Sequence, residues 1–236
     1  MTQQNCFLSG ATGGLGIEIA NELVKNGYNL FLTSKSEKSL KTLKNNLTNI
    51  NSNSKIHYCS GDLNQVSDIE KIIRNCRKHF ASIDILINCA GIFIVKSLKN
   101  SSLKDFETSF NVNCRAPLIF SKEFSKDMTR RKWGRIVNIG SSSSYSGFRN
   151  TSIYCASKHG ILGLSRSLHN ELKDKNVRTI CISPGSVKTP MGKKVKNQNY
   201  ENFIDPKEIS QILVSLIRLN SDMVVDEIRL NRIKMS

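Results

Sequence analysis

Short apolar runs alternate with longer helical patterns along the whole chain. Several of these runs are rich in Ile and Val and show no alternation with polar residues, which is typical of strands buried on both faces. Strands joined through helices pair in parallel, because each crossover returns the chain to the same edge of the sheet. The sequence therefore predicts an α/β fold in three layers, with a parallel sheet covered by helices on both faces.

The apolar runs predict about seven strands, at Cys6–Ser9, Tyr28–Thr33, Lys55–Ser60, Ile83–Asn88, Arg135–Ile139, Val177–Ser183 and Met223–Leu230. Between them, apolar side chains spaced three or four residues apart predict helices. One long helix is predicted from about Leu103 to Met128, in which Pro117 can introduce a kink. Another is predicted from about Ser152 to Lys175, and the last begins at Asp205-Pro206-Lys207-Glu208, an N-cap followed by proline and glutamate.

At 236 residues the chain is long enough to bury a full core. No internal repeat, long linker or low-complexity segment divides it, so one domain is expected over residues 1–236. The least patterned stretch is Ser186–Ile204, which carries Lys188, Lys193, Lys194 and Lys196. A loop of this length at the carboxyl end of a strand often closes over a bound substrate as a lid.

The chain is strongly basic, with a net charge of +16. Such a surface can meet nucleic acid, an anionic membrane, or an acidic substrate or partner. The basic residues are scattered and form no stripe with interleaved aromatic residues, so no nucleic-acid partner is expected. A coding bias toward Lys and Asn is the alternative explanation of the charge.

The seven cysteines form no C-x-x-C pair, and most of them lie in apolar runs. They predict buried free thiols in a reducing cytoplasm, and no metal site is expected. The N-terminus, MTQQNCFLSG, lacks a basic flank followed by an apolar run, so no secretory signal is expected. No stretch approaches the ~20 apolar residues that span a bilayer, so no membrane partner is expected.

The first strand runs directly into a glycine-rich turn, Ser9-Gly10-Ala11-Thr12-Gly13-Gly14-Leu15-Gly16, and a helix follows. Glycines allow a tight turn and let the backbone approach a pyrophosphate, while the free N–H groups of the helix N-terminus attract the phosphates. Between the first strand and first helix of an α/β chain, this turn predicts a Rossmann-type, doubly wound sheet that binds a dinucleotide.

The end of the second strand indicates which dinucleotide is bound. An acidic residue there would bind the ribose 2′-hydroxyl of NAD(H). The sequence instead reads Leu32-Thr33-Ser34-Lys35-Ser36, with hydroxyl groups and a cation that would favour the extra phosphate of NADP(H). NADP(H) is therefore expected over NAD(H), and the alternative is that Lys35 is an ordinary surface lysine.

Seven motifs, spread over essentially the whole chain, resemble those of the short-chain dehydrogenase/reductase family and occur in the same order. After the glycine turn they are Asp62-Leu63, Asn88-Cys89-Ala90-Gly91, Asn113 in Phe110-Asn111-Val112-Asn113, Ile139-Gly140-Ser141, Tyr154-Cys155-Ala156-Ser157-Lys158, and Pro184-Gly185 with Thr189. Two positions depart from the family pattern, because Ser9 replaces its threonine and Cys89 replaces an asparagine.

The resemblance implies a catalytic set and a cofactor-binding set of residues. The catalytic set is Asn113, Ser141, Tyr154 and Lys158. The set implied for NADP(H) comprises Ser9, Gly10, Thr12, Gly13, Gly14, Leu15, Gly16, Ser34, Lys35, Asp62, Leu63, Asn88, Ala90, Gly91, Tyr154, Lys158, Pro184, Gly185, Val187 and Thr189.

The chemistry explains the residue types of the catalytic set. Carbonyl reduction needs a hydride and a proton, and a tyrosine hydroxyl can give the proton although its ordinary pKa is ~10. A nearby lysine ammonium stabilises the phenolate, and Tyr154 and Lys158, four residues apart, share one helix face. Ser141 lies thirteen positions before Tyr154, where its hydroxyl can bond the substrate oxygen. By resemblance, Asn113 positions a water in a relay that reaches Lys158.

Other side chains compete for these roles. Ser142 and Ser143 directly follow Ser141, so either could be the serine that is used. The four histidines are expected to be structural or exposed rather than catalytic. His159 adjoins Lys158 but points from a different face of the predicted helix.

The substrate is less constrained than the reaction. The pattern is closest to the 3-oxoacyl-[acyl-carrier-protein] reductases, which implies a 3-oxoacyl thioester and an acidic carrier protein as candidate partners. Their cationic docking positions resemble the segment Arg130-Arg131-Lys132-Trp133-Gly134-Arg135 and Lys175, with lysine where arginine is expected, and this face is expected near the active site. The alternative is an ordinary solvated surface.

Two features limit the inference about the substrate. The segment between Pro184 and Asp205 is shorter than in many relatives, and the glycine-rich V-D-G-G close of the family is missing after Met223–Leu230. A sugar-nucleotide or secondary-metabolite carbonyl is therefore an alternative substrate. A regulatory protein that binds NADP without turnover is the alternative from another class. The resemblance also implies a homodimer or homotetramer, paired through the helices at Leu103–Met128 and Ser152–Lys175.

Overall fold

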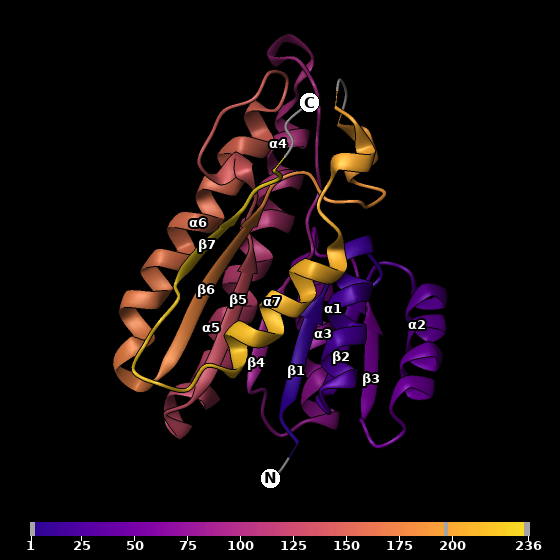
Figure 1. Ribbon diagram of the computed structural model, residues 1–236, viewed down its shortest axis with the longest axis vertical. Helices are drawn as coiled ribbons and strands as arrows, with labels where there is room; N and C mark the ends of the chain where they lie inside the picture. Colours follow the sequence, from indigo (N-terminus) through magenta and orange to yellow (C-terminus); the bar gives the residue numbers. More distant parts are fainter. Residues whose placement is uncertain (1–2, 196–197, 234–236) are drawn as a thin grey trace.

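The computed structural model describes residues 3–195 and 198–233. Its centre is a sheet of seven parallel strands in the order β3-β2-β1-β4-β5-β6-β7 (Figure 1). The strands are β1 Asn5–Ser9, β2 Asn29–Ser34, β3 Ile56–Ser60, β4 Ile85–Asn88, β5 Gly134–Ile139, β6 Val177–Pro184 and β7 Glu227–Leu230. This order reverses direction between β1 and β4, so the predicted doubly wound α/β sheet is confirmed.

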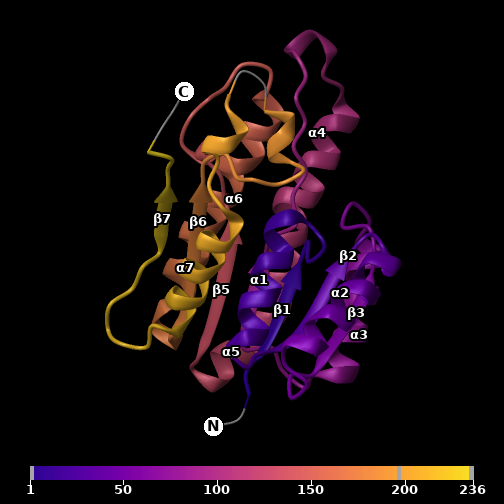
Figure 2. The ribbon, with the colours of Figure 1, turned by 45° about the vertical axis from the view of Figure 1, so that its right-hand side comes forward.

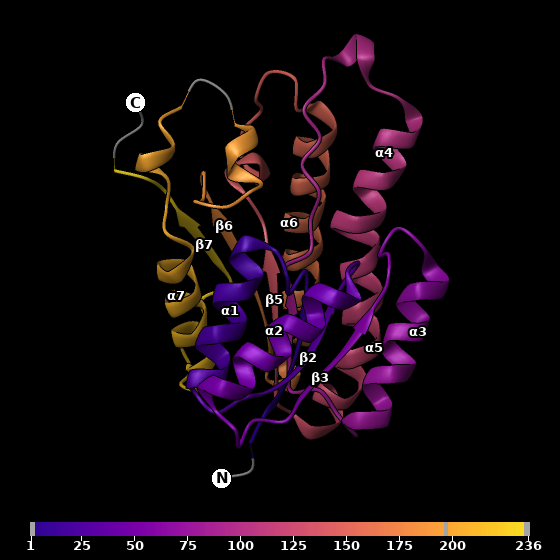
Figure 3. The same ribbon diagram turned by 90° about the vertical axis from the view of Figure 1, so that its right-hand side faces the viewer.

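Helices cover both faces of the sheet (Figure 3). The first, second and last of them pack together on one face, and the others lie on the opposite face. They are α1 Gly14–Lys25, α2 Glu37–Ile50, α3 Val66–His79, α4 Leu103–Phe110, α5 Ala116–Arg131, α6 Ser152–Leu172 and α7 Pro206–Arg218. Asp205 caps α7 by accepting a hydrogen bond from the Lys207 N–H (2.9 Å), as the sequence predicts.

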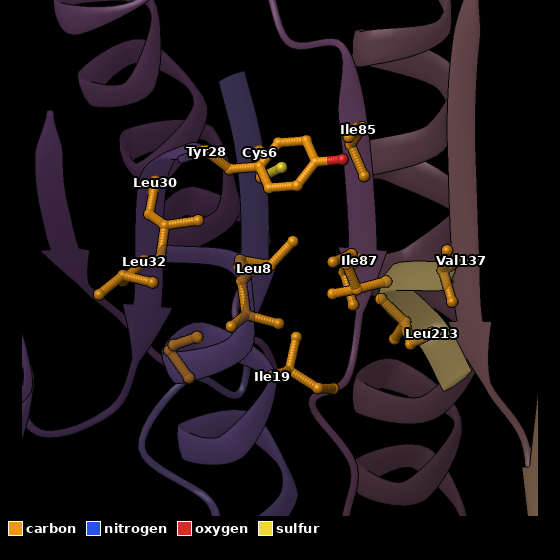
Figure 4. Close-up of a cluster of buried hydrophobic side chains, with 14 of the residues drawn as sticks. Cys6, Leu8, Ile19, Tyr28, Leu30, Leu32, Ile85, Ile87, Val137 and Leu213 are labelled. Atoms are coloured by element: carbon orange, nitrogen blue, oxygen red, sulfur yellow. The ribbon is translucent and has the colours of Figure 1, made fainter. Parts of the chain in front are cut away.

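The alternation of side chains along each strand divides the core between the two faces. Cys6 and Leu8 of β1 point to the face that carries α1 and α7, where they pack with Ile87 and Leu213 (Figure 4). Phe7, between them in sequence, points to the other face and contacts the rings of Phe31, Phe120 and Phe124. Burial on both faces explains why the strands are continuously apolar in sequence.

The predicted helix over Leu103–Met128 is interrupted. A π-helical turn, Asn111–Arg115, separates α4 from α5, and Pro117 lies in the first turn of α5. The turn before α5 is itself helical, since the Ala116 N–H bonds the Asn111 carbonyl, and Pro117 cannot donate the next such bond. The irregularity that the sequence allows at Pro117 is therefore found as a π-helical turn directly before it, which widens the helix at Asn113.

The last strand is shorter than its apolar run. Met223 and Val224 are exposed and lie in the connection from α7, so the strand begins at Glu227 instead of Met223. Arg178 holds this connection by donating a hydrogen bond to the Met223 carbonyl (3.0 Å). The prediction failed here because an apolar run does not distinguish a strand from an exposed loop.

Parallel strands bring three loops together at their carboxyl ends. Residues 89–102 follow β4, residues 140–151 follow β5, and residues 185–205 follow β6 (Figures 1 and 2). The Lys96 N–H donates to the Asn150 carbonyl (2.8 Å), which joins the first two loops. In the third, Val187 pairs with Ile204 in an isolated bridge, and two short 3₁₀ turns lie between them. Lys196 of the expected lid lies outside the described residues.

Candidate active site

The glycine turn packs against the end of β4. Gly10 has φ of +70°, and a Cβ on it would lie 2.6 Å from the Ala90 Cα. A Cβ on Gly16 would lie 2.1 Å from the Gly10 carbonyl oxygen, so this turn closes only with glycine at both positions. The Ser9 hydroxyl accepts the Ala90 N–H (3.3 Å) and completes the junction of two predicted motifs.

The first turn of α1 fits a pyrophosphate. It contains no acidic residue, and Gly13, its N-cap, provides no side-chain cap, so the backbone N–H groups of the first turn are left for a ligand. A Cβ on Gly14 would lie 2.8 Å from the Thr189 Cγ2 and 3.1 Å from the Pro190 Cδ. The turn after β1 and the segment after β6 therefore meet, and Thr189 closes over the helix N-terminus where the sequence predicts cofactor contact.

The residues predicted to select the dinucleotide lie at the ends of β2 and β3. Lys35 Nζ forms an ion pair with Asp62 Oδ2 at 3.0 Å, so these two predicted cofactor contacts also bond each other. The Lys35 side chain is 66% exposed, which leaves it free to turn toward a ligand. The Ser34 hydroxyl is buried without a hydrogen-bond partner among the described residues. Leu63 is buried in the core, so its backbone is the part that can face a cofactor.

Tyr154 and Lys158 lie one turn apart on α6 and are both buried. Lys158 Nζ donates to the Ile139 carbonyl at the end of β5 (2.7 Å) and lies 5.8 Å from the centre of the Tyr154 ring. Phe93 packs edge-on against Tyr154, with ring centres 4.7 Å apart. The ammonium group is thus held by a backbone oxygen beside the phenol, and no carboxylate within residues 3–195 and 198–233 bonds it.

Ser141 begins the turn that follows β5. Its hydroxyl accepts the Ser143 N–H (3.1 Å), and its own N–H donates to the Ser144 hydroxyl (3.1 Å). Ser143 and Ser144 are buried, whereas Ser141 is half-buried. Burial therefore argues against Ser143 as the reacting serine. Ser142 is also half-buried but lies one residue further into the 3₁₀ turn.

Asn113 lies inside the π-helical turn, and its side chain clamps the loop after β4. Its amide oxygen accepts the Ile92 N–H (2.9 Å), and its amide nitrogen donates to the Ile92 carbonyl (3.1 Å). A Cβ on Gly91 would lie 3.5 Å from the Asn113 amide oxygen and 3.8 Å from Lys158 Nζ. The structure thus brings Asn113, Gly91 and Lys158 together, as the predicted relay requires.

Two buried serines that sequence reasoning missed support this asparagine. The Ser157 hydroxyl accepts from the Asn113 amide nitrogen (2.9 Å) and donates to the Tyr154 carbonyl (2.8 Å). The Ser109 hydroxyl donates to Ser157 (3.3 Å). These bonds tie the π-helical turn to α6. Ser157 directly precedes Lys158 in the motif, which could have marked it as a residue near the site. The direction of its side chain, however, could not be read from the sequence.

The remaining predicted cofactor residues divide between backbone and side-chain roles. Asn88 donates to the Asn138 side chain (2.8 Å), so its amide nitrogen links β4 to β5. Gly185 donates its N–H to the Leu230 carbonyl (2.8 Å), which joins the ends of β6 and β7. Thr12 precedes α1 and Leu15 lies in its first turn, while Pro184 ends β6 and Val187 follows it; the cofactor contacts of these four residues stay predictions.

The cysteines around Lys158 are poor nucleophiles. Burial raises the pKa of Cys89 to about 12 and that of Cys114 to about 11, and the neighbouring Lys158 charge opposes this only in part. Both thiols therefore stay protonated at neutral pH. All seven cysteines are free. Within the described residues, no three His, Cys, Asp or Glu side chains gather in a way that could hold a metal ion.

The expected basic docking face does not lie near this site. Residues 130–135 and Lys175 lie where β5 and β6 begin, whereas Ser141 follows the carboxyl end of β5 (Figure 1). The prediction is therefore wrong within this chain. Sequence proximity to β5 was taken as proximity to the site, although a strand places its two ends at opposite edges of the sheet.

The arginines of this segment are also engaged in the fold. Arg131 pairs with Asp84 (2.8 Å), and Arg130 pairs with Asp127 (2.9 Å). Arg135 is fully buried and donates to the Leu219 carbonyl at the end of α7 (2.7 Å). Burial without a carboxylate lowers the pKa of Arg135 to about 10.

Comparisons with known proteins show which family the chain resembles. The family model of the short chain dehydrogenases matches residues 4–200. The 3-oxoacyl-[acyl-carrier-protein] reductase FabG of Buchnera aphidicola subsp. Baizongia pistaciae is 30% identical over 237 residues, which cover 96% of this chain and 95% of that protein. FabG of Rickettsia bellii is also 30% identical, over 204 residues that cover 85% of this chain and 80% of that protein.

Solved structures share the fold. An alcohol dehydrogenase from the archaeon Thermococcus sibiricus, complexed with 5-hydroxy-NADP, superposes with a TM-score of 0.88 at 24% identity, covering 98% of this chain and 97% of that one. A metagenomic short-chain oxidoreductase in complex with NADP gives a TM-score of 0.84 at 23% identity, covering 97% and 96%. No helix in the described part of the chain is long and apolar enough to cross a membrane.

The contact between Gly14 and Thr189 gives a test of the phosphate turn. We expect Gly14→Ala to raise the Kd for NADPH roughly tenfold, because the added methyl pushes the threonine segment off the helix N-terminus. Thr189→Ser removes only the methyl at 2.8 Å and leaves the Thr189 Cβ at 2.9 Å, so the double variant should recover at most a small part of the affinity. Fluorescence titration measures both, and Gly147→Ala, with no atom within 4 Å, is the control. Unchanged affinity in Gly14→Ala would contradict the assignment.

Proposed function

Because the chain belongs to the short-chain dehydrogenase family, we propose that it is an NADP(H)-dependent oxidoreductase that interconverts a carbonyl and a secondary alcohol. The observation that carries the proposal is the buried Tyr154–Lys158 pair on α6. Its ammonium is held 5.8 Å from the phenol ring, at the edge of the sheet that carries the glycine turn. A buried ammonium beside a buried phenol stabilises the phenolate, so the phenol can act as a general acid and the phenolate as a general base.

Each residue of the set has a distinct part in the proposed reaction. The nicotinamide, when bound, supplies or accepts the hydride. Tyr154 donates the proton to the carbonyl oxygen during reduction and takes it back during oxidation, and Lys158 stabilises the phenolate in between. The Ser141 hydroxyl bonds the same oxygen. Asn113 holds the Ile92 backbone and, with Lys158, faces the position of Gly91, where a water can return the proton to Tyr154.

A 3-oxoacyl thioester is the substrate class we propose, with acyl carrier protein as a candidate carrier. The curated relatives named for this reaction match most of the chain at about 30% identity. The three loops at the site also present exposed apolar side chains, Val95, Leu98, Phe148 and Met191. Exposed basic residues lie close to them in sequence, including Lys99, Arg149 and Lys193. This combination suits an apolar acyl group that carries an anionic tail.

Tyr154→Phe tests the mechanism, because it removes one hydroxyl and keeps the buried ring. We expect kcat with an acetoacetyl thioester to fall by roughly 10²–10⁴, the usual contribution of a general acid, while the Kd for NADPH changes far less, because Tyr154 is one of many predicted cofactor contacts. NADPH oxidation across a carbonyl panel measures the first, and fluorescence titration measures the second. A variant that turns over like the wild type would overturn the mechanism. A wild type that binds NADPH but reduces no carbonyl would favour the regulatory alternative.

The cofactor preference has its own test at Lys35. We expect the wild type to bind NADPH more tightly than NADH, and Lys35→Ala to weaken NADPH roughly tenfold without affecting NADH, because only NADPH carries the 2′-phosphate. Lys38→Ala, an exposed lysine on α2, is the matched control. Equal affinities of the wild type for the two cofactors would contradict the proposal.

We also propose a homodimer or homotetramer, formed through α4, α5 and α6. Leu103, Phe106 and Leu118 expose large apolar side chains on α4 and α5, and Gly160 and Gly163 are exposed on α6. Light scattering should show at least a dimer, and Phe106→Asp should shift it toward the monomer. Ile50→Asp, at an exposed apolar residue on α2, is the control. A monomeric wild type would refute this assembly.

The seven free thiols support a reducing cytoplasm as the compartment.

A further inference from the structure

A carboxylate on the last strand joins the two elements that carry the catalytic residues. Glu227 of β7 bonds Arg166 of α6 and Tyr145, the residue that ends the Ser141 turn. We propose that Glu227, acting through Tyr145, is a positioning residue that holds the Ser141 turn in register with the Tyr154 helix. This inference rests on the proposed function, because it assigns the joint a part in the same reaction.

The contacts of Glu227 fix its carboxylate from two sides. Arg166 approaches it through two nitrogens, with Nε bonded to Oε1 and Nη2 to Oε2 (3.1 Å for the second). The Tyr145 hydroxyl donates to Oε2 (2.9 Å). Hydrogen bonds from the guanidinium group lower the pKa of Glu227, so the carboxylate is ionised at neutral pH. Two-pronged bonding by arginine sets direction as well as distance.

Tyr145 transmits this restraint to the catalytic serine. Ser141 and Ser144 bond each other's backbone and side chain at one end of the turn, and the Tyr145 N–H donates to the Ser142 carbonyl (3.1 Å) at the other. The turn is therefore closed within itself, and its orientation on the sheet depends on what holds its ends. Gly140 fixes the first end against β6, since a Cβ there would lie 2.3 Å from the Ser183 hydroxyl. The bond from Tyr145 to Glu227 fixes the second.

The charges around this joint make the carboxylate hard to replace. Glu227 and Arg229 stand two residues apart on β7, so they share one face of the strand. The Arg229 guanidinium lies over the Tyr145 ring, 3.4 Å from its centre, while Arg166 approaches from α6. Loss of the Glu227 charge would leave Arg166 without its carboxylate, beside the Arg229 guanidinium that lies over the Tyr145 ring. The charged and titratable groups here are Glu227, Arg166, Arg229, Tyr145 and the buried Cys181.

Two conservative variants test the joint. Tyr145→Phe removes only the hydroxyl and keeps the ring under Arg229, and Glu227→Gln keeps the size but removes the charge. We expect each to lower kcat roughly 5- to 30-fold with KM for NADPH unchanged, because the cofactor turn lies on other elements. The kcat of the double variant should be no lower than that of the less active single variant, because both changes break the same connection. Glu208→Gln, at an exposed glutamate of α7, is the matched control.

Hydrogen exchange separates this inference from the proposed function. The amides of residues 142–146 should exchange faster in both variants than in the wild type, whether or not any carbonyl is reduced. If the wild type shows no reductase activity, the proposed function fails, and faster exchange still supports the joint. Wild-type kcat and wild-type exchange in Tyr145→Phe would overturn it. A loss of kcat in Glu227→Gln that Tyr145→Phe does not share would also overturn it, because the restraint would not pass through Tyr145.

Discussion

All seven strands run in one direction, and everything at the site depends on this. Each strand leaves the sheet at the same edge, so the turns after β1, β4, β5 and β6 meet although they are far apart in sequence. They meet closely enough that backbones touch. The Ala90 Cα lies where a Cβ on Gly10 would be, and the Ser183 hydroxyl lies where a Cβ on Gly140 would be, so only glycine fits at these two positions. The glycines are therefore a consequence of parallel strands converging.

Where the strand ends converge, polar backbone groups are buried. Side chains of the site provide hydrogen-bond partners for these groups. The loop after β4 crosses the edge without strand partners, and Asn113 satisfies the Ile92 backbone in their place. To reach that loop, Asn113 has to project from a widened helical turn, and Ser157 and Ser109 occupy its remaining amide donor. Lys158 is held in the same way by the Ile139 carbonyl. Groups that would otherwise cost free energy when buried become a rigid support for Tyr154.

The sequence predicted the fold and the residue types of the site well, because both rest on local patterns. Continuous apolar runs indicated the sheet, and the motif at Tyr154 indicated one helix face. What the sequence could not provide was direction and distance. It indicated a possible kink at Pro117 but not the π-helical turn that contains Asn113, and it began β7 at the exposed Met223. It also treated Lys35 and Asp62 as separate contacts, and only the folded chain shows that they pair. The role of Glu227 was invisible, because its partners lie 61 and 82 positions away.

The same reasoning applies to the basic composition of the chain. Resemblance to the carrier-protein reductases suggested a docking face at residues 130–135 and Lys175, but Arg130 and Arg131 are paired and Arg135 is buried. Arg135 and Arg178 both bond the Leu219 carbonyl at the end of α7, where the helix dipole is negative. Arg166 bonds the Glu227 carboxylate on β7, and Arg229 lies over the Tyr145 ring. These four arginines therefore hold α7 and β7 against neighbouring elements of the fold. Exposed basic residues of the loops after β4, β5 and β6, such as Lys99, Arg149 and Lys193, lie at the edge where the strands converge.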